Sequence, residues 1–236
     1  FDEFDFFAVS PAVVEHPLRA GERKSQVFEF ESMVGEPVNI EVALDEVMSD
    51  YAHSLRDWLE LRSQTEFNLP GRAKTRLAMT IAVPREAEDG SYHGKAMFKA
   101  FGAESGELLT ETVVPVNVLV GIEHQHTIQF SSVTAQTVAD EGTYLSLHLL
   151  NNGNVAFLPQ VSAIVFNEEG EFMQRVVFEL PEELDQLLPL QRQHVSAFAA
   201  ELAEGTYTLE IEVAHDGVEI LTETHQVIVT NSELKP

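Results

Sequence analysis

The stretch GELLTETVVPVNVLV at residues 106–120 has a near copy later in the chain, GVEILTETHQVIVT at residues 217–230. In both, a glycine turn leads into LTET and then into a run in which valine alternates with other residues. Successive side chains of a strand point to opposite faces, so the alternation predicts β-strands with one buried face. A period of about 112 residues is longer than that of solenoid repeats and indicates a duplicated domain.

The likeness between the two halves extends upstream of LTET. Each half contains Leu-Pro, a basic patch, an alternating stretch, an acidic residue before Gly-[Ser/Thr]-Tyr, a second alternating stretch and a glycine turn. In TYTLEIEVAHD at 206–216, Tyr207, Leu209, Ile211 and Val213 share one face, as in a half-buried strand. We therefore predict an all-β chain with an N-terminal domain at 1–121 and a C-terminal domain at 122–236.

Pro115 interrupts the first valine run. Proline has no backbone N–H and cannot donate a hydrogen bond to a neighbouring strand. The strand around Pro115 is therefore expected at a sheet edge, or paired on one side only at that point.

Composition excludes several classes of partner. The formal net charge is −25, and residues 1–121 hold 21 acidic and 11 basic side chains whereas residues 122–236 hold 18 and 3. Binding to nucleic acid or to an anionic membrane needs clustered Lys and Arg, so neither is expected. No apolar run is long enough to span a bilayer, and without cysteine the chain depends on packing for its stability.

Glu88-x-Gly90-x-Tyr92 and Gly205-x-Tyr207 resemble the sequence that opens strand F of immunoglobulin-like domains. In that family the tyrosine forms a corner, with its hydroxyl bonded back to the backbone, and a cysteine usually follows two residues later. Here Gly94 and Leu209 stand in place of the cysteine. The resemblance implies two tandem immunoglobulin-like antiparallel β-sandwich domains.

A second resemblance concerns bacterial surface modules. FAVSPAVVEHPLRAGE at 7–22, followed by WLELRSQTEFNLPGRAKTRLAMTIAVPREAEDGSYHG at 58–94, is similar to the tandem domains of WxL-interacting cell-surface proteins. LHLLNNGNVAFLPQVSAIVFNEEGEF at 147–172 resembles their companion domain, with Asn152-Gly153 as a hairpin turn between two strands. The resemblance implies a secreted or surface protein without a cofactor.

Two segments depart from strand patterning. Between Leu44 and Leu59, apolar residues recur at spacings of three and four, which predicts a short helix inserted in the first domain at about 45–56. A strand should follow from Trp58 through Leu61, with Trp58 in the core. PEELDQLLP at 181–189 could form one or two helical turns that cross between sheets.

We predict no catalytic and no metal site. Nucleophile elbows, P-loops and dinucleotide fingerprints are absent from the sequence, so the chain is not expected to be an enzyme. His124 and His126 could grip one Zn²⁺ from one strand face, but no third ligand lies nearby in the sequence. Two acidic clusters could offer oxygen ligands to Ca²⁺, although neither has a recognisable coordination spacing; they are Asp2, Glu3 and Asp5, and Asp45, Glu46 and Asp50.

The predicted function is a non-enzymatic secreted or cell-surface binding or adhesion protein that acts through sheet edges and loops. The expected partner is another envelope protein or a cell-wall polymer, and the expected location is extracytoplasmic, with any anchor in sequence outside this segment. Candidate partner-binding residues form a valine strand and a basic strip, namely Val114, Val116, Val118 and Val120, and Arg56, Arg62, Arg72, Lys74 and Arg76.

Two alternatives remain open. One is an accessory domain pair of a larger extracellular enzyme. The other is a periplasmic pilus-assembly chaperone, a family that the chain resembles in its Ser-Pro start and in an alternating hydrophobic strand suited to holding a subunit. That family anchors the subunit's terminal carboxylate with a basic residue on the same strand, and residues 106–120 contain none.

Overall fold

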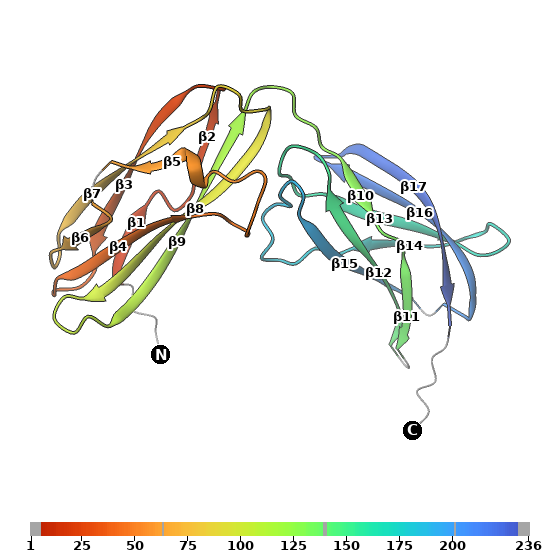
Figure 1. The fold of residues 1–236 in the computed structure, drawn as a ribbon. Helices are drawn as coiled ribbons and strands as arrows, with labels where there is room; N and C mark the ends of the chain where they lie inside the picture. The colour runs from red at the N-terminus through yellow and green to blue at the C-terminus, as the bar shows by residue number, and fades with distance from the viewer. Residues whose placement is uncertain (1–5, 63, 139–140, 201, 231–236) are drawn as a thin grey trace. The chain divides into compact units, whose positions relative to one another are not determined.

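The chain folds into two separate all-β units (Figure 1). The computed structural model describes residues 6–62, 64–138, 141–200 and 202–230. The contacts between residues divide the chain between Glu123 and His124. The sequence had placed the boundary two residues earlier, between residues 121 and 122. The buried hydrophobic residues form two clusters, one in each unit. The predicted fold class, two tandem immunoglobulin-like β-sandwiches, is confirmed.

Unit 1 is a sandwich of two sheets. One has the strand order β1-β3-β7-β5, and the other has the order β2-β9-β8-β4-β6, in which β2 joins β9 in parallel and the other pairs are antiparallel. The elements are β1 (Phe7–Ser10), β2 (Val14–Leu18), β3 (Arg23–Ser32), β4 (Val38–Asp45), the 3₁₀ turn η1 (Arg56–Trp58), β5 (Leu59–Leu61), β6 (Glu66–Leu69), β7 (Lys74–Ala82), β8 (Gly90–Gly102) and β9 (Leu108–Val120).

Unit 2 repeats this plan with antiparallel sheets. In one sheet β10 and β11 pair with successive parts of β12, which also pairs with β15; the other has the order β14-β13-β16-β17. The elements are β10 (Ile128–Phe130), β11 (Thr134–Val138), β12 (Gly142–Asn151), β13 (Gln160–Phe166), β14 (Phe172–Phe178), β15 (Arg192–Ala199), β16 (Gly205–His215) and β17 (Val218–Val229).

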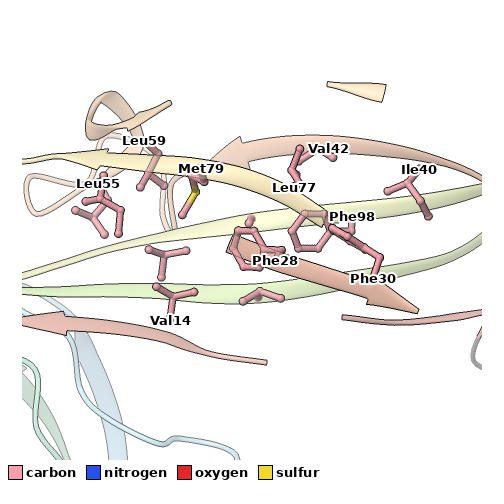
Figure 2. Close-up of a cluster of buried hydrophobic side chains, with 14 of the residues drawn as sticks. Val14, Phe28, Phe30, Ile40, Val42, Leu55, Leu59, Leu77, Met79 and Phe98 are labelled. Atoms are coloured by element: carbon pink, nitrogen blue, oxygen red, sulfur yellow. The ribbon is translucent and has the colours of Figure 1, made fainter. Parts of the chain in front are cut away.

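The core of unit 1 is built around three phenylalanines that meet between the sheets (Figure 2). Phe28 and Phe30 come from β3, and Phe98 comes from β8 of the opposite sheet. The Phe98 ring lies 5.2 Å from Phe28 and 4.9 Å from Phe30, both in edge-to-face geometry. Such pairs add to the free energy gained by burying the rings, so they hold the two sheets together without a disulfide.

Both predicted tyrosine corners are present. The Tyr92 hydroxyl donates to the carbonyl oxygen of Glu88 at 3.1 Å, and the Tyr207 hydroxyl donates to that of Ala203 at 3.0 Å. Each tyrosine is largely buried near the start of the second-last strand of its unit, β8 or β16. The repeated Gly-x-Tyr motif therefore marks equivalent structural positions in the two units.

The helix predicted at about 45–56 is absent. Asp45 ends β4, residues 46–55 are irregular, and a 3₁₀ turn occupies Arg56–Trp58. The backbone here bonds to β8: His93 N–H donates to His53 O at 2.8 Å, and Leu55 N–H donates to His93 O at 2.9 Å. A short isolated helix is marginal in water, and this pairing together with the full burial of Leu55 outweighs it.

The strand predicted after this segment is present as β5, from Leu59 to Leu61. Trp58 directly precedes it and packs against the core, with its ring 4.3 Å from that of Tyr92. The interpretation of Trp58 as a packing residue is thus confirmed.

Two turn predictions in unit 2 need correction. Asn152-Gly153 does not form a two-residue hairpin, because β12 and β13 belong to different sheets and residues 152–159 cross between them. Asn151 fixes the start of this crossing, since its amide donates to the carbonyls of Val155 and Leu187, both at 2.8 Å. Residues 181–189 also cross between sheets, as a turn with an isolated bridge at Leu187 and not as helical turns.

The corner bonds give a testable stability difference. Tyr92→Phe should lower the free energy of unfolding of unit 1 by about 1 kcal/mol, because the Glu88 carbonyl loses its partner. Trp58 is the chain's one tryptophan, so its fluorescence during urea unfolding reports on unit 1. Tyr51→Phe is the matched control, since the buried Tyr51 hydroxyl has no hydrogen-bond partner among the residues that the structure describes. An equal loss in both variants would contradict the assignment.

Candidate protein-binding edge

Strand β9 is covered on both sides along only part of its length. Antiparallel β8 accompanies it throughout, whereas parallel β2 pairs with it from Val116 to Val120. Among the described residues, no strand pairs with the other side of Leu108–Pro115. We call Leu108–Pro115 the open edge; its position beside β8 can be followed in Figure 1. A strand edge without a neighbour presents backbone N–H and C=O groups that another chain can pair with.

The open edge ends at Pro115, the proline that the sequence singled out. β2 pairing starts at Val14 opposite Val116, directly after Pro115, and at Pro115 itself only β8 is a neighbour. The prediction that β9 pairs on one side at Pro115 is confirmed. β1 lies in the other sheet, and among the described strands only β2, which is five residues long, pairs with the outer side of β9. Its short length leaves the first part of β9 open.

Two apolar side chains stand out from the open edge. Leu108 is 55% exposed and Val113 is 46% exposed, on a strand where Glu111 also points outward and lies 3.5 Å from Lys99. The sequence prediction missed Leu108 and Val113 because it followed the other face of the alternation. For Val113 the signal was available, because it lies on the face opposite the buried valines. Leu108 lies beyond a shift in the β8–β9 register, which the alternation does not reveal.

The four valines predicted to meet a partner are core residues. Val114, Val116, Val118 and Val120 are each 0% exposed. Their side chains close the interior of unit 1, so a partner cannot contact them without unfolding it. The prediction must be corrected: what β9 can offer is its backbone edge and the outward residues between these valines.

The basic strip lies elsewhere on unit 1. Lys74 and Arg76 extend from β7 in the opposite sheet, where they form ion pairs of 2.9 Å with Glu31 and Glu29 on β3. Arg62 donates from Nε to Thr80 Oγ1 at 2.6 Å. These contacts make the face a mixed-charge, solvated surface. The structure does not bring the basic strip together with β9.

Arg56 and Arg72 lie outside the strands of that sheet. Arg56 is exposed on η1, and Arg72 is exposed in the turn before β7, where its φ angle is +57°. A residue with positive φ serves the turn itself. Neither residue lies on β7 with Lys74 and Arg76.

A buried histidine lies on β8 next to the irregular segment. His93 is 2% exposed, with Nδ1 2.8 Å from Asn117 Oδ1 and Nε2 2.9 Å from Ser91 Oγ. An amide oxygen only accepts, so Nδ1 carries the proton and Nε2 accepts from the Ser91 hydroxyl. Burial lowers the pKa of His93 to about 4, which keeps the ring neutral at pH 7.

The histidines proposed as zinc ligands pack against aromatic rings. The His126 ring stacks on His215 at 4.9 Å and meets Phe157 at 5.1 Å, and burial together with the nearby His215 lowers the pKa of His126. His124, two positions before His126, is half-buried. Among the described residues, no group of three or more His, Asp or Glu side chains could hold a metal ion.

Of the two acidic clusters considered as calcium ligands, the structure describes only the one at Asp45, Glu46 and Asp50. Asp2, Glu3 and Asp5 lie outside the described residues. Asp45 accepts from the N–H of Glu46 at 2.9 Å and lies 3.8 Å from Lys95 Nζ, and Asp50 sits in a turn with a φ angle of +55°. Asp45 is thus engaged by a cation of the protein itself.

Within the described ranges, no helix is long and apolar enough to cross a membrane.

The fold matches solved structures of chaperones. The crystal structure of the YadV chaperone matches with a TM-score of 0.50 and 9% identity, over 94% of this chain and 100% of that one. The Salmonella enterica SafA pilin in complex with the SafB chaperone gives a TM-score of 0.49 at 11% identity, over 94% and 96%. Class 5 fimbriae chaperone CfaA gives 0.47 at 14% identity, over 95% and 100%.

A scan against protein-family models and a search of curated proteins found no match. At identities this low, the match to the YadV chaperone establishes the fold alone. Of the two resemblances drawn from the sequence, the comparisons support the immunoglobulin-like β-sandwich and not the narrower likeness to WxL-interacting proteins.

Neutral His93 makes the stability of unit 1 pH-dependent. Its pKa of about 4 in the folded chain lies below the ordinary value of 6.5, so the unfolded chain binds the proton first. The stabilisation is therefore complete above about pH 6.5 and is lost as pH falls toward 4, by roughly 3 kcal/mol.

Urea unfolding followed by Trp58 fluorescence between pH 7 and pH 4 measures this effect. In His93→Gln, which keeps one donor and one acceptor, the slope between pH 6.5 and pH 4 should be flatter than in the parent. The comparison separates His93 from carboxylates that titrate over the same range. Identical slopes in both proteins would exclude His93 as the cause.

Proposed function

We propose that the protein is a non-enzymatic, extracytoplasmic binding protein that holds an extended segment of another envelope protein against the open edge, in the manner of a pilus-assembly chaperone. The observation that carries this proposal is the open edge: from Leu108 to Pro115, β9 pairs with β8 on one side and, among the described strands, with none on the other. Leu108 and Val113 are exposed along it. The shared fold of the YadV chaperone supports the comparison.

An added strand has a defined place on unit 1. Eight residues of β9 are open, which corresponds to a partner segment of about 26 Å at the usual rise of a strand. The segment would continue the line of β2 and stop where β2 begins. Backbone hydrogen bonds give such a complex its affinity, and alternate side chains give it specificity. Pro115 removes one donor, so recognition is concentrated on residues 108–114.

The side chains favour an apolar segment. Leu108 and Val113 would pack against apolar residues of the partner, while Glu111 is already engaged by Lys99 at 3.5 Å. The formal charge of −25 repels acidic partners at long range and favours neutral or basic ones. An extended segment with alternating apolar residues and little negative charge fits the edge best.

The chain differs from the chaperone pattern in one respect. No basic residue lies on β9 to anchor a terminal carboxylate. Lys95 and Lys99 on neighbouring β8 are the nearest candidates in the sheet, and they lie 3.8 Å from Asp45 and 3.5 Å from Glu111. We therefore propose that the partner is held along an internal segment, without capture of its C-terminus.

This proposal replaces surface adhesion as the leading hypothesis. Adhesion was inferred from the resemblance to surface modules and from the valine strand, whose side chains are buried. A chaperone-like role uses the strand's backbone edge and is compatible with that burial. The predicted partner class, an envelope protein, is retained.

Site-specific crosslinking tests the edge. A photo-reactive phenylalanine analogue at Val113, in the full chain expressed in its native host, should capture a partner peptide that is extended and carries alternating apolar residues. Glu210 is the control, because it is exposed on β16 and pairs with Ile164 of β13 on one side and with Thr224 of β17 on the other. Equal capture at both positions, or none at Val113, would refute the proposed edge.

Charge placed on the open edge should weaken the complex. Val113→Lys is expected to reduce affinity for the captured peptide about tenfold, since it replaces an apolar contact with a charge that must be desolvated. Thr208→Lys, at a partly exposed position of β16 that pairs with β13 and β17, should leave the affinity unchanged. Affinity is measured by calorimetry with the synthetic peptide, and unfolding followed by Trp58 fluorescence verifies that unit 1 remains folded.

A further inference from the structure

A shallow depression of about 490 Å³ lies on the outer face of the second sheet of unit 1. It is formed by β4, β6 and the end of the β8–β9 hairpin, and every residue that lines it is described. The residues that matter for its chemistry are Asn39, Glu41, Glu66, Asn68, Phe101 and Gly106. Its volume is within the range of small-molecule sites, about 300–1,000 Å³.

Strand register arranges the polar side chains in two rows. Asn39 on β4 lies opposite Asn68 on β6 and opposite Phe101 on β8. Two residues further along β4, Glu41 lies opposite Glu66 and Lys99. Residues two apart on a strand share a face, so an aromatic ring, two amides and two carboxylates converge on one surface.

The two amide side chains, of Asn39 and Asn68, are held in place and still have a donor and an acceptor that are not used between them. Asn68 Nδ2 donates to Asn39 Oδ1 at 2.9 Å, which fixes both side chains. The pair retains the Asn39 amide as a donor and Asn68 Oδ1 as an acceptor. Such a fixed donor beside a fixed acceptor matches two neighbouring hydroxyl groups of a ligand.

The second row places two carboxylates, Glu41 and Glu66, opposite each other, an arrangement that does not stabilise the fold. Like charges directly opposite each other on neighbouring strands are destabilising. In the described part of the chain, neither Glu41 nor Glu66 has an ion-pair partner, because Lys99 is directed to Glu111 at 3.5 Å. Both carboxylates are exposed and remain able to accept hydrogen bonds.

We propose that this depression binds a neutral oligosaccharide. The half-buried Phe101 ring offers its electron-rich face to the C–H groups on one face of a sugar. The Asn39 amide donates to sugar hydroxyls, while Asn68 Oδ1 and the two carboxylates accept from them. The carboxylates exclude acidic sugars. Gly106 forms the rim with no side chain, and no atom lies within 4 Å of the position that its Cβ would take, so the site opens to chains longer than one sugar.

The depression and the open edge are different surfaces that adjoin at the β8–β9 hairpin, where Phe101 lies opposite Leu108. In the sheet order β2-β9-β8-β4-β6, the open edge is the outer side of β9, whereas the depression lies over β4 and β6. A ligand here would attach unit 1 to a glycan while β9 remained accessible. The inference therefore does not rest on the proposed function.

Nuclear magnetic resonance titration of the full ¹⁵N-labelled chain tests the inference, with maltotetraose, cellotetraose and N-acetylchitotetraose as probes. At least one should shift resonances of β4, β6 and residues 101–106 with saturation at millimolar concentration. Tetragalacturonate, the acidic counterpart, should cause no shifts there. No saturable shift with any neutral probe, or equal shifts with tetragalacturonate or with the cation spermidine, would overturn the proposal.

Substitutions in the depression test whether the probe binds there. Phe101→Ala and Glu66→Gln should each weaken binding of the active probe about tenfold, the loss expected for one ring contact or one charge-assisted hydrogen bond. Phe172→Ala removes a 64% exposed phenylalanine from unit 2 and should change nothing. Glu66→Gln is isosteric and keeps the test valid if Phe101→Ala destabilises unit 1. Unchanged affinity in both variants would place the binding elsewhere and refute the site, and Val113→Lys should leave the titration unaltered.

Discussion

The structure of unit 1 depends on the inward orientation of alternate residues in its last strand. Val114, Val116, Val118 and Val120 are fully buried and form the part of the unit 1 core that β9 contributes. Tyr92 fixes this orientation, because it lies opposite Val118 and its hydroxyl bonds back to Glu88. With no disulfide available, the edge-to-face contacts of Phe98 on β8 with Phe28 and Phe30 on β3 join the two sheets.

Unit 2 uses the same constraint with a different register. Tyr207 lies opposite Val227, as Tyr92 lies opposite Val118. Thr224, the last residue of the second LTET, precedes Val227 by three positions, whereas Thr112 precedes Val118 by six. The two LTET stretches thus occupy the same strand of each unit but not the same place along it. Alternation in a sequence reports that a strand is half-buried; the register comes from the turn and the corner.

The sequence was informative where one residue type has one structural use. Pro115 marks one-sided pairing, and Gly-x-Tyr marks the corner, because few other arrangements satisfy proline's missing donor or a buried hydroxyl. It was misleading at 45–56 and at Asn152-Gly153, where local preference competes with long-range pairing. A helical spacing of apolar residues does not reveal that His93 supplies backbone partners to His53 and Leu55. Nor does an Asn-Gly pair reveal that the next strand joins the other sheet.

The candidate site follows the same division. That β9 would be an edge strand could be read from Pro115, but which of its residues face outward depends on which face the core occupies. The opposite choice of face explains why the prediction selected Val114 in place of Val113. The basic strip failed for a different reason: a sequence shows cations, but not the carboxylates of Glu29 and Glu31 that the neighbouring strand places beside Arg76 and Lys74.

An uncovered edge strand is a hazard for any β-sandwich, because it invites pairing with copies of itself. In unit 1 the hazard is confined. β2 covers the last five residues of β9, Pro115 interrupts the donors at the boundary, and the outward Glu111 adds charge to the exposed part. A longer β2 would remove the hazard with no change to the core, since the buried valines face inward in either case. That the edge stays open although the fold could close it is the strongest structural argument that it serves a partner.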